Sequence, residues 1–166
     1  MVCGFIVQRL TEGGVRTGFR VVPINSEFPP SIIEFEISMP GIFIHRGKHD
    51  ITVLEEAIEQ VEQSSHDPRF KLLLLDEIGG IELTSRVFSD TLNRILSGNI
   101  PCIGVWKSRE NLIRASGMLG LETVYDKLHR ECETNIKKYA ELFTVTEKNI
   151  TEIKEHLKKY IDSIFM

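Results

Sequence analysis

The sequence contains 166 residues, of which 42% are hydrophobic and 27% are charged, and its formal net charge at pH 7 is -4. These values are typical of a globular protein, so we expect one domain over residues 1–166, and the acidic balance provides no general attraction for nucleic acid or an anionic membrane. Three cysteines without C-x-x-C spacing, the lack of an apolar run of about 18 residues and the lack of a signal-peptide pattern predict a soluble, cytoplasmic protein with reduced thiols and with no membrane or nucleic-acid partner.

The amino-terminal part of the chain is predicted to be β-structure. Residues 2–9 and 15–24 have the composition of strands, and the Glu-Gly-Gly turn at 12–14 between them predicts a β-hairpin. Residues 32–37 alternate between apolar and polar side chains and are expected to form another strand. A further short strand is expected at 41–45.

From residue 50 onward the pattern alternates between helices and strands. Apolar side chains at helical spacing between Val53 and Val61 predict a first helix. A second helix is expected to begin at Thr84 or Ser85, and the apolar runs 70–75 and 100–106 on either side of it predict buried strands. This order of elements predicts a layered α/β fold with a mostly parallel sheet, preceded by the hairpin.

Beyond Trp106 the sequence is predicted to be largely helical. Residues 112–119 and 121–142 carry apolar side chains at spacings of three and four, and residues 149–165 have the pattern of an amphipathic helix. Between these segments, Leu142 to Val145 is a candidate for a last short strand. The fold is therefore expected to carry extra carboxyl-terminal helices.

The buried strand at 70–75 leads directly into two adjacent acids, Asp76 and Glu77. The carboxyl ends of such strands form the crevices in which α/β proteins bind ligands. A hydrophobic strand followed by two acids is the Walker B arrangement, in which the first acid holds Mg²⁺ and the second orients the water that attacks a terminal phosphate. We therefore predict Asp76 as a metal ligand and Glu77 as a catalytic residue. The alternative is a solvated strand end, with Glu77 as a favourable charge before the next helix.

The phosphate-binding loop that accompanies a Walker B strand is not found in these residues. The motif G-x-x-x-x-G-K-[ST] does not occur between Met1 and Met166. In the nearest approach, Gly41 and Gly47 are separated by five residues instead of four, and His49 replaces the hydroxyl residue that would bind Mg²⁺. We therefore reject this segment as a phosphate-binding loop.

Several motifs resemble those of the nucleoside-triphosphatase family known from thermophiles and from human cancer-related nucleoside triphosphatase. Residues 76–83 are similar to its DEIG-x-x-E-L signature, and Gly4-Phe5 with residues 12–22 resembles its amino-terminal hairpin. Residues 143–149 are similar to its closing strand and the start of its last helix. The resemblance implies a P-loop NTPase fold and Mg²⁺-dependent hydrolysis of nucleoside triphosphates to diphosphate and phosphate.

The sequence also departs from the family pattern. Family members place a strand, a G-x-x-x-x-G-K-T loop and a helix before the hairpin, whereas this sequence starts at the hairpin itself. Val7-Gln8-Arg9 stands where the family has Thr-Glu-Glu, and Gly80 replaces the usual lysine after DEIG. Residues 108–141 are longer than expected between the last strands and are interpreted as a helical insertion.

Cationic side chains near the predicted crevice are candidates for binding nucleotide. Arg16 could meet phosphate from a hairpin strand, although exposed hairpin positions are commonly arginine. Arg109 follows the last buried strand, together with Lys107 and Arg114. A lid at this position could carry an arginine finger. The alternative is that these cations lie on a solvated helix face. Glu82 could face the same crevice or be an exposed acid of the first helical turn.

These observations favour a nucleotide-related protein that retains Walker B, lacks the phosphate-binding loop, and is weak or inactive as an isolated chain. One alternative is a functional nucleoside triphosphatase whose loop is missing from this sequence through a mis-assigned start, truncation or gene splitting. Another is a non-enzymatic protein-interaction module on the same scaffold. A missing strand would leave an apolar sheet edge open, which predicts a homodimer or a partner chain that covers the edge.

Overall fold

The structure is a computed structural model that describes residues 1–24, 29–111 and 122–166. The strands are β1 (Val2–Glu12), β2 (Val15–Pro23), β3 (Ile32–Glu34), β4 (Ile42–His45), β5 (Lys48–His49), β6 (Leu72–Ile78) and β7 (Cys102–Trp106). The helices are α1 (Thr52–Ser65), the short 3₁₀ helix η1 (Ile81–Thr84), α2 (Arg86–Leu96), α4 (Glu122–Ile136) and α5 (Ile150–Phe165).

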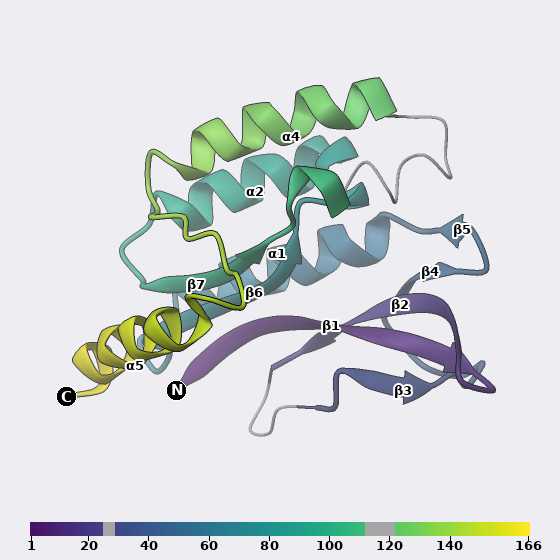
Figure 1. The fold of residues 1–166 in the computed structure, drawn as a ribbon, viewed down its shortest axis with the longest axis horizontal. Helices are drawn as coiled ribbons and strands as arrows, with labels where there is room; N and C mark the ends of the chain where they lie inside the picture. Colours follow the sequence, from purple (N-terminus) through teal and green to yellow (C-terminus); the bar gives the residue numbers. More distant parts are fainter. Residues whose placement is uncertain (25–28, 112–121) are drawn as a thin grey trace.

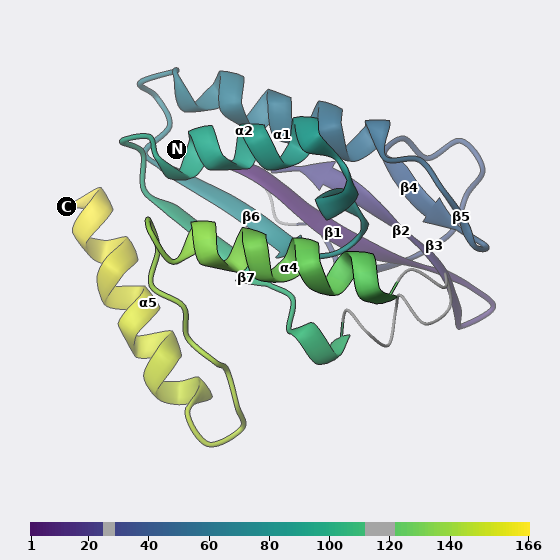
Figure 2. The same cartoon turned by 90° about the horizontal axis from the view of Figure 1, so that it is seen from above.

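One sheet contains all seven of these strands. Six follow the order β5-β4-β2-β1-β6-β7, and β3 pairs with β1. Helices α1, α2 and α4 lie together on one face of the sheet, and the view from above shows them running over it (Figure 1, Figure 2). The molecule is therefore a layered α/β fold in which β2 and β1 are the middle strands and β6 lies next to the edge strand β7.

The sheet is mixed, which corrects the expectation of a mostly parallel sheet. Strand β1 pairs in parallel with β3 and β6, and β6 pairs in parallel with β7. The pairs β1–β2, β2–β4 and β4–β5 are antiparallel. The antiparallel half arises because two tight hairpins, β1–β2 and β4–β5, extend the sheet away from the parallel crossovers.

The segment between β4 and β5 is a hairpin turn. His45 pairs with Lys48, and the two residues between them, Arg46 and Gly47, have φ values of 48° and 78°. Two consecutive positive φ values in a two-residue loop are typical of a type I′ turn. This geometry agrees with the rejection of residues 41–48 as a phosphate-binding loop.

The hydrophobic core lies between the sheet and the helices. Alternate side chains of β1, namely Cys3, Phe5 and Val7, belong to this core, as expected for a strand with one face against a helical layer. On the helical side the core is completed chiefly by Leu54, Ala57, Ile58 and Val61 of α1 and by Phe88, Leu92 and Ile95 of α2. The sequence correctly predicted both helices from this spacing.

Helix α2 begins directly after Ser85, one of the two residues at which its start was predicted. The hydroxyl of Ser85 accepts a hydrogen bond from the Phe88 amide at 3.0 Å. This bond satisfies an amide that would otherwise have no partner at the start of the helix. The cap therefore determines where the chain leaves η1 and enters α2.

One edge of β1 is shared by two strands in succession. Near its amino terminus β1 pairs with β6, with Val2 opposite Leu72 and Phe5 opposite Leu75. Further along, the same strand pairs with β3, with Arg9 opposite Ile32. Since β6 ends its pairing before β3 begins, a short gap is left beside residues 6–8 of β1.

The carboxyl-terminal part of the chain differs from the prediction in one element. Leu142 to Val145 is not a strand; it is an irregular, exposed segment. Helix α5 lies outside the layer of α1, α2 and α4 and has no buried residue (Figure 1, Figure 2). The helix predicted at 112–119 lies outside the described residues. Within the described residues, no helix has the length and apolar character needed to span a membrane.

Candidate functional site

The acids Asp76 and Glu77 lie in a β-bulge at the carboxyl end of β6. Leu75 lies opposite Gly104 of β7, whereas Ile78 lies opposite Trp106, so β6 has one more residue than β7 over this stretch. Glu77 has a φ value of 52°, which is uncommon for a residue other than glycine. Bulges next to functional sites redirect side chains, and this one turns the two acids toward different neighbours.

Asp76 occupies the gap beside β1. Its Oδ2 accepts a hydrogen bond from the Val7 amide at 3.0 Å. This amide lies between the part of β1 that pairs with β6 and the part that pairs with β3, where Arg9 donates to the Ser31 carbonyl. The carboxylate therefore replaces the missing strand partner, and it ties the end of β6 to the middle of β1.

The environment of Asp76 raises the pKa of its carboxyl group. Burial is the largest cause, and the neighbouring charge of Glu77 acts in the same direction. The hydrogen bond from the Val7 amide opposes this shift because it favours the charged form. A nearby cation would relieve the cost of keeping this carboxylate ionised.

Glu77 lies between two cationic side chains from different strands. Its Oε1 is 3.7 Å from Arg9 Nη2, and its Oε2 is 3.7 Å from Lys107 Nζ. Arg9 comes from β1 and Lys107 directly follows β7. Both distances exceed the normal length of a hydrogen bond, so these contacts are loose ion pairs.

Glu82 is buried and does not act as an exposed helix acid. Only 5% of its surface is exposed, and its Oε1 accepts hydrogen bonds from the amides of Gly80, at 2.7 Å, and Gly79. Gly79 has a φ value of 109°, which lies in the region that favours glycine. Glu82 therefore holds the turn that follows the two acids.

The other predicted ligand residues contact groups other than the acidic pair. Arg16 is exposed on β2, where its guanidinium lies over the Phe19 ring at 5.5 Å. Arg109 forms an ion pair with Asp126 of α4, and this pairing is the main cause of its raised pKa. Arg114 lies outside the described residues. A role in nucleotide binding for Arg16 and Arg109 stays a prediction.

Arg9 is the residue of this cluster that sequence reasoning did not select. In the sequence Arg9 stands out only as a departure from a family motif. Its contact with Glu77 joins two strands that are far apart in the chain, so no local pattern predicts it. The signal was the position itself: a cation stands on β1 where the resembling family has an acid. The sequence places Lys107 in a possible lid, whereas in the structure it contacts Glu77.

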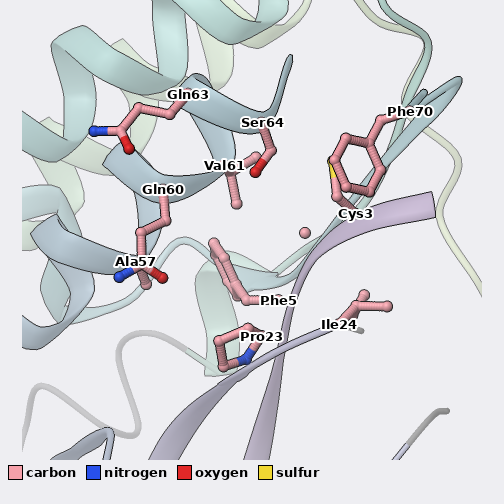
Figure 3. A pocket seen from close by; sticks show the side chains of 11 residues that line it. Cys3, Phe5, Pro23, Ile24, Ala57, Gln60, Val61, Gln63, Ser64 and Phe70 are labelled. Carbon is pink, nitrogen blue, oxygen red and sulfur yellow. The ribbon is translucent and has the colours of Figure 1, made fainter. Parts of the chain in front are cut away.

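A hollow of about 290 Å³ lies elsewhere, near the amino-terminal end of β1. Figure 3 shows Phe5, Val61 and Phe70 around it, with Gln60 and Ser64 at its rim. Asp76 and Glu77 are not among the residues that line it. The acidic pair is therefore a separate site at the opposite part of the β1–β6 pairing.

Comparison with known proteins identifies the family. A family model described as NTPase matches residues 1–158. The chain belongs to the NTPase family. Since the match includes β1, β6 and β7, it covers every strand that contributes to the acidic site.

Two relatives in the NTPase family extend this finding. The chain is 30% identical to the nucleoside-triphosphatase THEP1 of Pyrobaculum islandicum over 75% of its own length and 67% of that protein. It is 20% identical to the nucleoside-triphosphatase THEP1 of Methanocaldococcus jannaschii over 94% of its length and 77% of that protein. Both comparisons extend beyond the DEIG segment to most of the chain.

A solved structure of the NTPase family has a similar fold. The crystal structure of THEP1 from the hyperthermophile Aquifex aeolicus matches 94% of this chain and 81% of its own, with a TM-score of 0.54 and 20% identity. The likeness supports the α/β architecture of this chain.

Proposed function

We propose that this chain binds a nucleoside triphosphate together with Mg²⁺ at the bulge of β6, and that residues 1–166 alone hydrolyse it weakly or not at all. The observation that supports this proposal is the separation of two adjacent acids by the bulge. Asp76 points to β1, and Glu77 points to the two cations. Two relatives carry the name nucleoside-triphosphatase, and this supports hydrolysis of nucleoside triphosphates as the activity to test.

Asp76 fits the role of a magnesium ligand. Among the described residues, no group of three or more histidine, cysteine or acidic side chains could hold a metal ion. Mg²⁺ in nucleotide sites needs only one or two carboxylates, with waters and phosphates as the remaining ligands. Asp76 is a half-buried carboxylate with a raised pKa, and a bound cation would favour its charged form. When bound there, Mg²⁺ would neutralise charge on the phosphates.

Glu77 fits the role of the residue that orients water. Its side chain is a quarter exposed, and it lies beside Asp76 without sharing the hydrogen bond from Val7. A carboxylate held next to a metal-bound phosphate accepts a hydrogen bond from the attacking water and positions it. The positive φ of Glu77 is consistent with a backbone that is constrained by function.

Low activity of the isolated chain follows from what phosphoryl transfer requires. Catalysis depends on positioning and on neutralisation of charge, and one well-placed cation can change the rate by roughly 10³ to 10⁵. The loop that normally supplies amides, a lysine and a magnesium-binding hydroxyl is not found between Met1 and Met166. The second candidate function is therefore full hydrolysis with this loop supplied from outside these residues, and the retained Glu77 favours it.

A third candidate is a protein-interaction module. The observation in its favour is α5, whose exposed apolar side chains include Ile150, Ile161 and Phe165. This reading predicts that the chain binds a specific protein and does not bind magnesium nucleotide. Calorimetry with Mg-ATP and Mg-GTP separates it from the two nucleotide-binding candidates.

Phosphate release tests the proposal. We expect any Mg²⁺-dependent release from ATP or GTP to fall about 100-fold, or to background, in Glu77→Gln, because water loses the group that orients it. Asp76→Asn should weaken Mg²⁺-dependent nucleotide binding in calorimetry. Glu131→Gln is the matched control, since Glu131 is an exposed acid of α4. Nucleotide binding that is absent in the unmodified chain, or unchanged in Asp76→Asn, would contradict the proposal.

A further inference from the structure

Arg9 and Lys107 are the cations closest to the proposed catalytic acid. They approach different oxygens of the same carboxylate, each at 3.7 Å. Among the described residues, neither side chain forms a hydrogen bond with Glu77, so their donors are not consumed by this contact. Half of the Arg9 side chain and a quarter of the Lys107 side chain are exposed, so an anion can reach both.

The position of Lys107 is determined by contacts on both sides of its backbone. Its amide donates to the Ile78 carbonyl at 2.7 Å, and its carbonyl oxygen lies 2.8 Å from Nε2 of the buried His129 of α4. A Cβ at Gly79 would lie 3.3 Å from the Lys107 Cβ, so the glycine allows this close approach. The lysine is therefore held over the turn that follows the acids.

The position of Arg9 is determined by the pairing of β1. Its amide donates to the Ser31 carbonyl at 2.9 Å, and its Cα lies opposite Phe19 of β2 and Ile32 of β3. Since side chains alternate along a strand, Arg9 lies on the same face as Val7, two residues away. The guanidinium therefore reaches Glu77 from a rigid central strand.

The cluster combines acidic side chains with two cations. Arg9 and Lys107 approach the two oxygens of Glu77, and a third acid, Glu82, is held by the amides of Gly79 and Gly80. Mg²⁺ at Asp76 would add positive charge beside the two cations, which suits the polyphosphate chain of a nucleotide. Guanidinium and ammonium groups are the usual protein donors to phosphate oxygens.

We propose that Arg9 and Lys107 bind the phosphate chain of the nucleotide, and that this chain replaces Glu77 as their partner. The released Glu77 carboxylate then orients water. In the absence of ligand the two cations hold Glu77, and binding of the polyphosphate exchanges one anion for another. This inference rests on the proposed function, because it assigns the phosphate-binding groups of the same site.

Calorimetry with inorganic triphosphate and Mg²⁺ tests this inference without requiring hydrolysis. We expect Arg9→Gln and Lys107→Gln each to weaken binding by roughly tenfold, since each removes one charge-assisted contact. Glu77→Gln should bind triphosphate more tightly than the unmodified chain, by about three-fold or more, because the competing carboxylate is gone. Parallel titrations with Mg-ATP show whether a free triphosphate or a nucleotide is the better ligand.

The matched controls are Arg69→Gln and Lys71→Gln. Lys71 directly precedes β6 and Arg69 lies two residues earlier, so both are at the end of that strand opposite to the acids. They carry the same charges as Arg9 and Lys107, so a nonspecific effect of net charge would appear equally in them. Arg9→Lys and Lys107→Arg keep the charge and should retain most of the affinity, which distinguishes lost binding from a fold that is disturbed.

The outcomes separate this inference from the proposed function. If Arg9→Gln and Lys107→Gln bind Mg-ATP and triphosphate as the unmodified chain does, the inference is wrong and the proposed function stands. If Glu77→Gln binds triphosphate more weakly, the exchange of partners is wrong. If the expected pattern of affinities appears but the unmodified chain releases no phosphate, both the inference and the proposed binding stand, and the isolated chain does not hydrolyse the nucleotide. Absence of all binding to the unmodified chain overturns both.

Discussion

Asp76 and Glu77 are maintained at a cost to stability. Burial and a neighbouring negative charge raise the pKa of Asp76, and Glu77 adopts a positive φ. Natural proteins commonly accept such costs at functional sites, where geometry matters more than stability. The hydrogen bonds from Gly79 and Gly80 to Glu82 and from Val7 to Asp76 hold this geometry in place.

Asp76→Asn is expected to raise the melting temperature at pH 7 in the absence of Mg²⁺ and nucleotide. A carboxyl whose pKa is raised in the folded state binds its proton more tightly there than in the unfolded chain. The contribution of Asp76 to stability therefore falls as the pH rises from 3.8, the pKa of this carboxyl in the unfolded chain, through its higher pKa in the folded protein. The amide of asparagine carries no charge and can still accept from Val7.

Melting curves of both proteins between pH 3 and pH 7 check this prediction. The advantage of the asparagine variant should shrink as pH falls and should vanish below the unfolded pKa of 3.8. Glu131→Gln, at an exposed position on α4, should show no such trend. If Asp76→Asn is instead less stable at pH 7, the prediction is wrong. The hydrogen bond from Val7 to the charged carboxylate would then stabilise the protein by more than the burial of that charge destabilises it.

At the scale of elements, the parallel pairing of β1 with β6 depends on a glycine. Gly4 has a φ value of 139°, and a Cβ at this position would lie 1.8 Å from the Leu74 carbonyl oxygen. No side chain can be accommodated at that distance, so only glycine lets the two backbones approach. This pairing carries Val7 to the position where it binds Asp76.

Gly4→Ala is expected to reduce the free energy of unfolding by roughly 3 kcal/mol or more, because backbone must move to relieve the contact. Gly13→Ala is the matched control: Gly13 also has a positive φ, 57°, but nothing lies within 4 Å of its added Cβ. It should lose only about 1 kcal/mol from the backbone conformation. Urea denaturation measures both, and equal losses would show that the close approach to Leu74 does not matter.

At the scale of the whole molecule, β7 presents an open edge. The Pro101 carbonyl and the Lys107 amide form hydrogen bonds with β6. Successive residues of a strand direct their backbone groups to opposite sides, so Cys102, Gly104 and Trp106 direct theirs away from β6. Within the described residues, no strand pairs with that side. An open strand edge readily pairs with another chain.

We therefore expect the protein to associate, as a homodimer or with a partner polypeptide that covers β7. Light scattering of the purified protein should give a mass of twice the 19.0 kDa of one chain as concentration rises. Hydrogen exchange should become slower at Cys102, Gly104 and Trp106 on association. A monodisperse monomer at every accessible concentration, with fast exchange at these amides, would contradict the self-association.

Local patterns were sufficient to predict most elements and the position of the acids. The spacing of apolar residues indicated α1, α2, β6 and α5 because each depends on side chains close together in the chain. The end of an apolar run located Asp76 and Glu77 for the same reason. The turn signal at 12–14 likewise predicted the hairpin of β1 and β2.

The tertiary structure decided how those elements meet. The mixed sheet, the bulge at Glu77 and the contact of Arg9 with Glu77 depend on the register between strands that are distant in sequence. Leu142 to Val145 is the clearest example. Its side chains suit a strand, yet the segment is irregular and pairs with none of the strands in the part of the chain that the structure describes. A strand exists only where a neighbour supplies hydrogen bonds, and no local pattern specifies that neighbour.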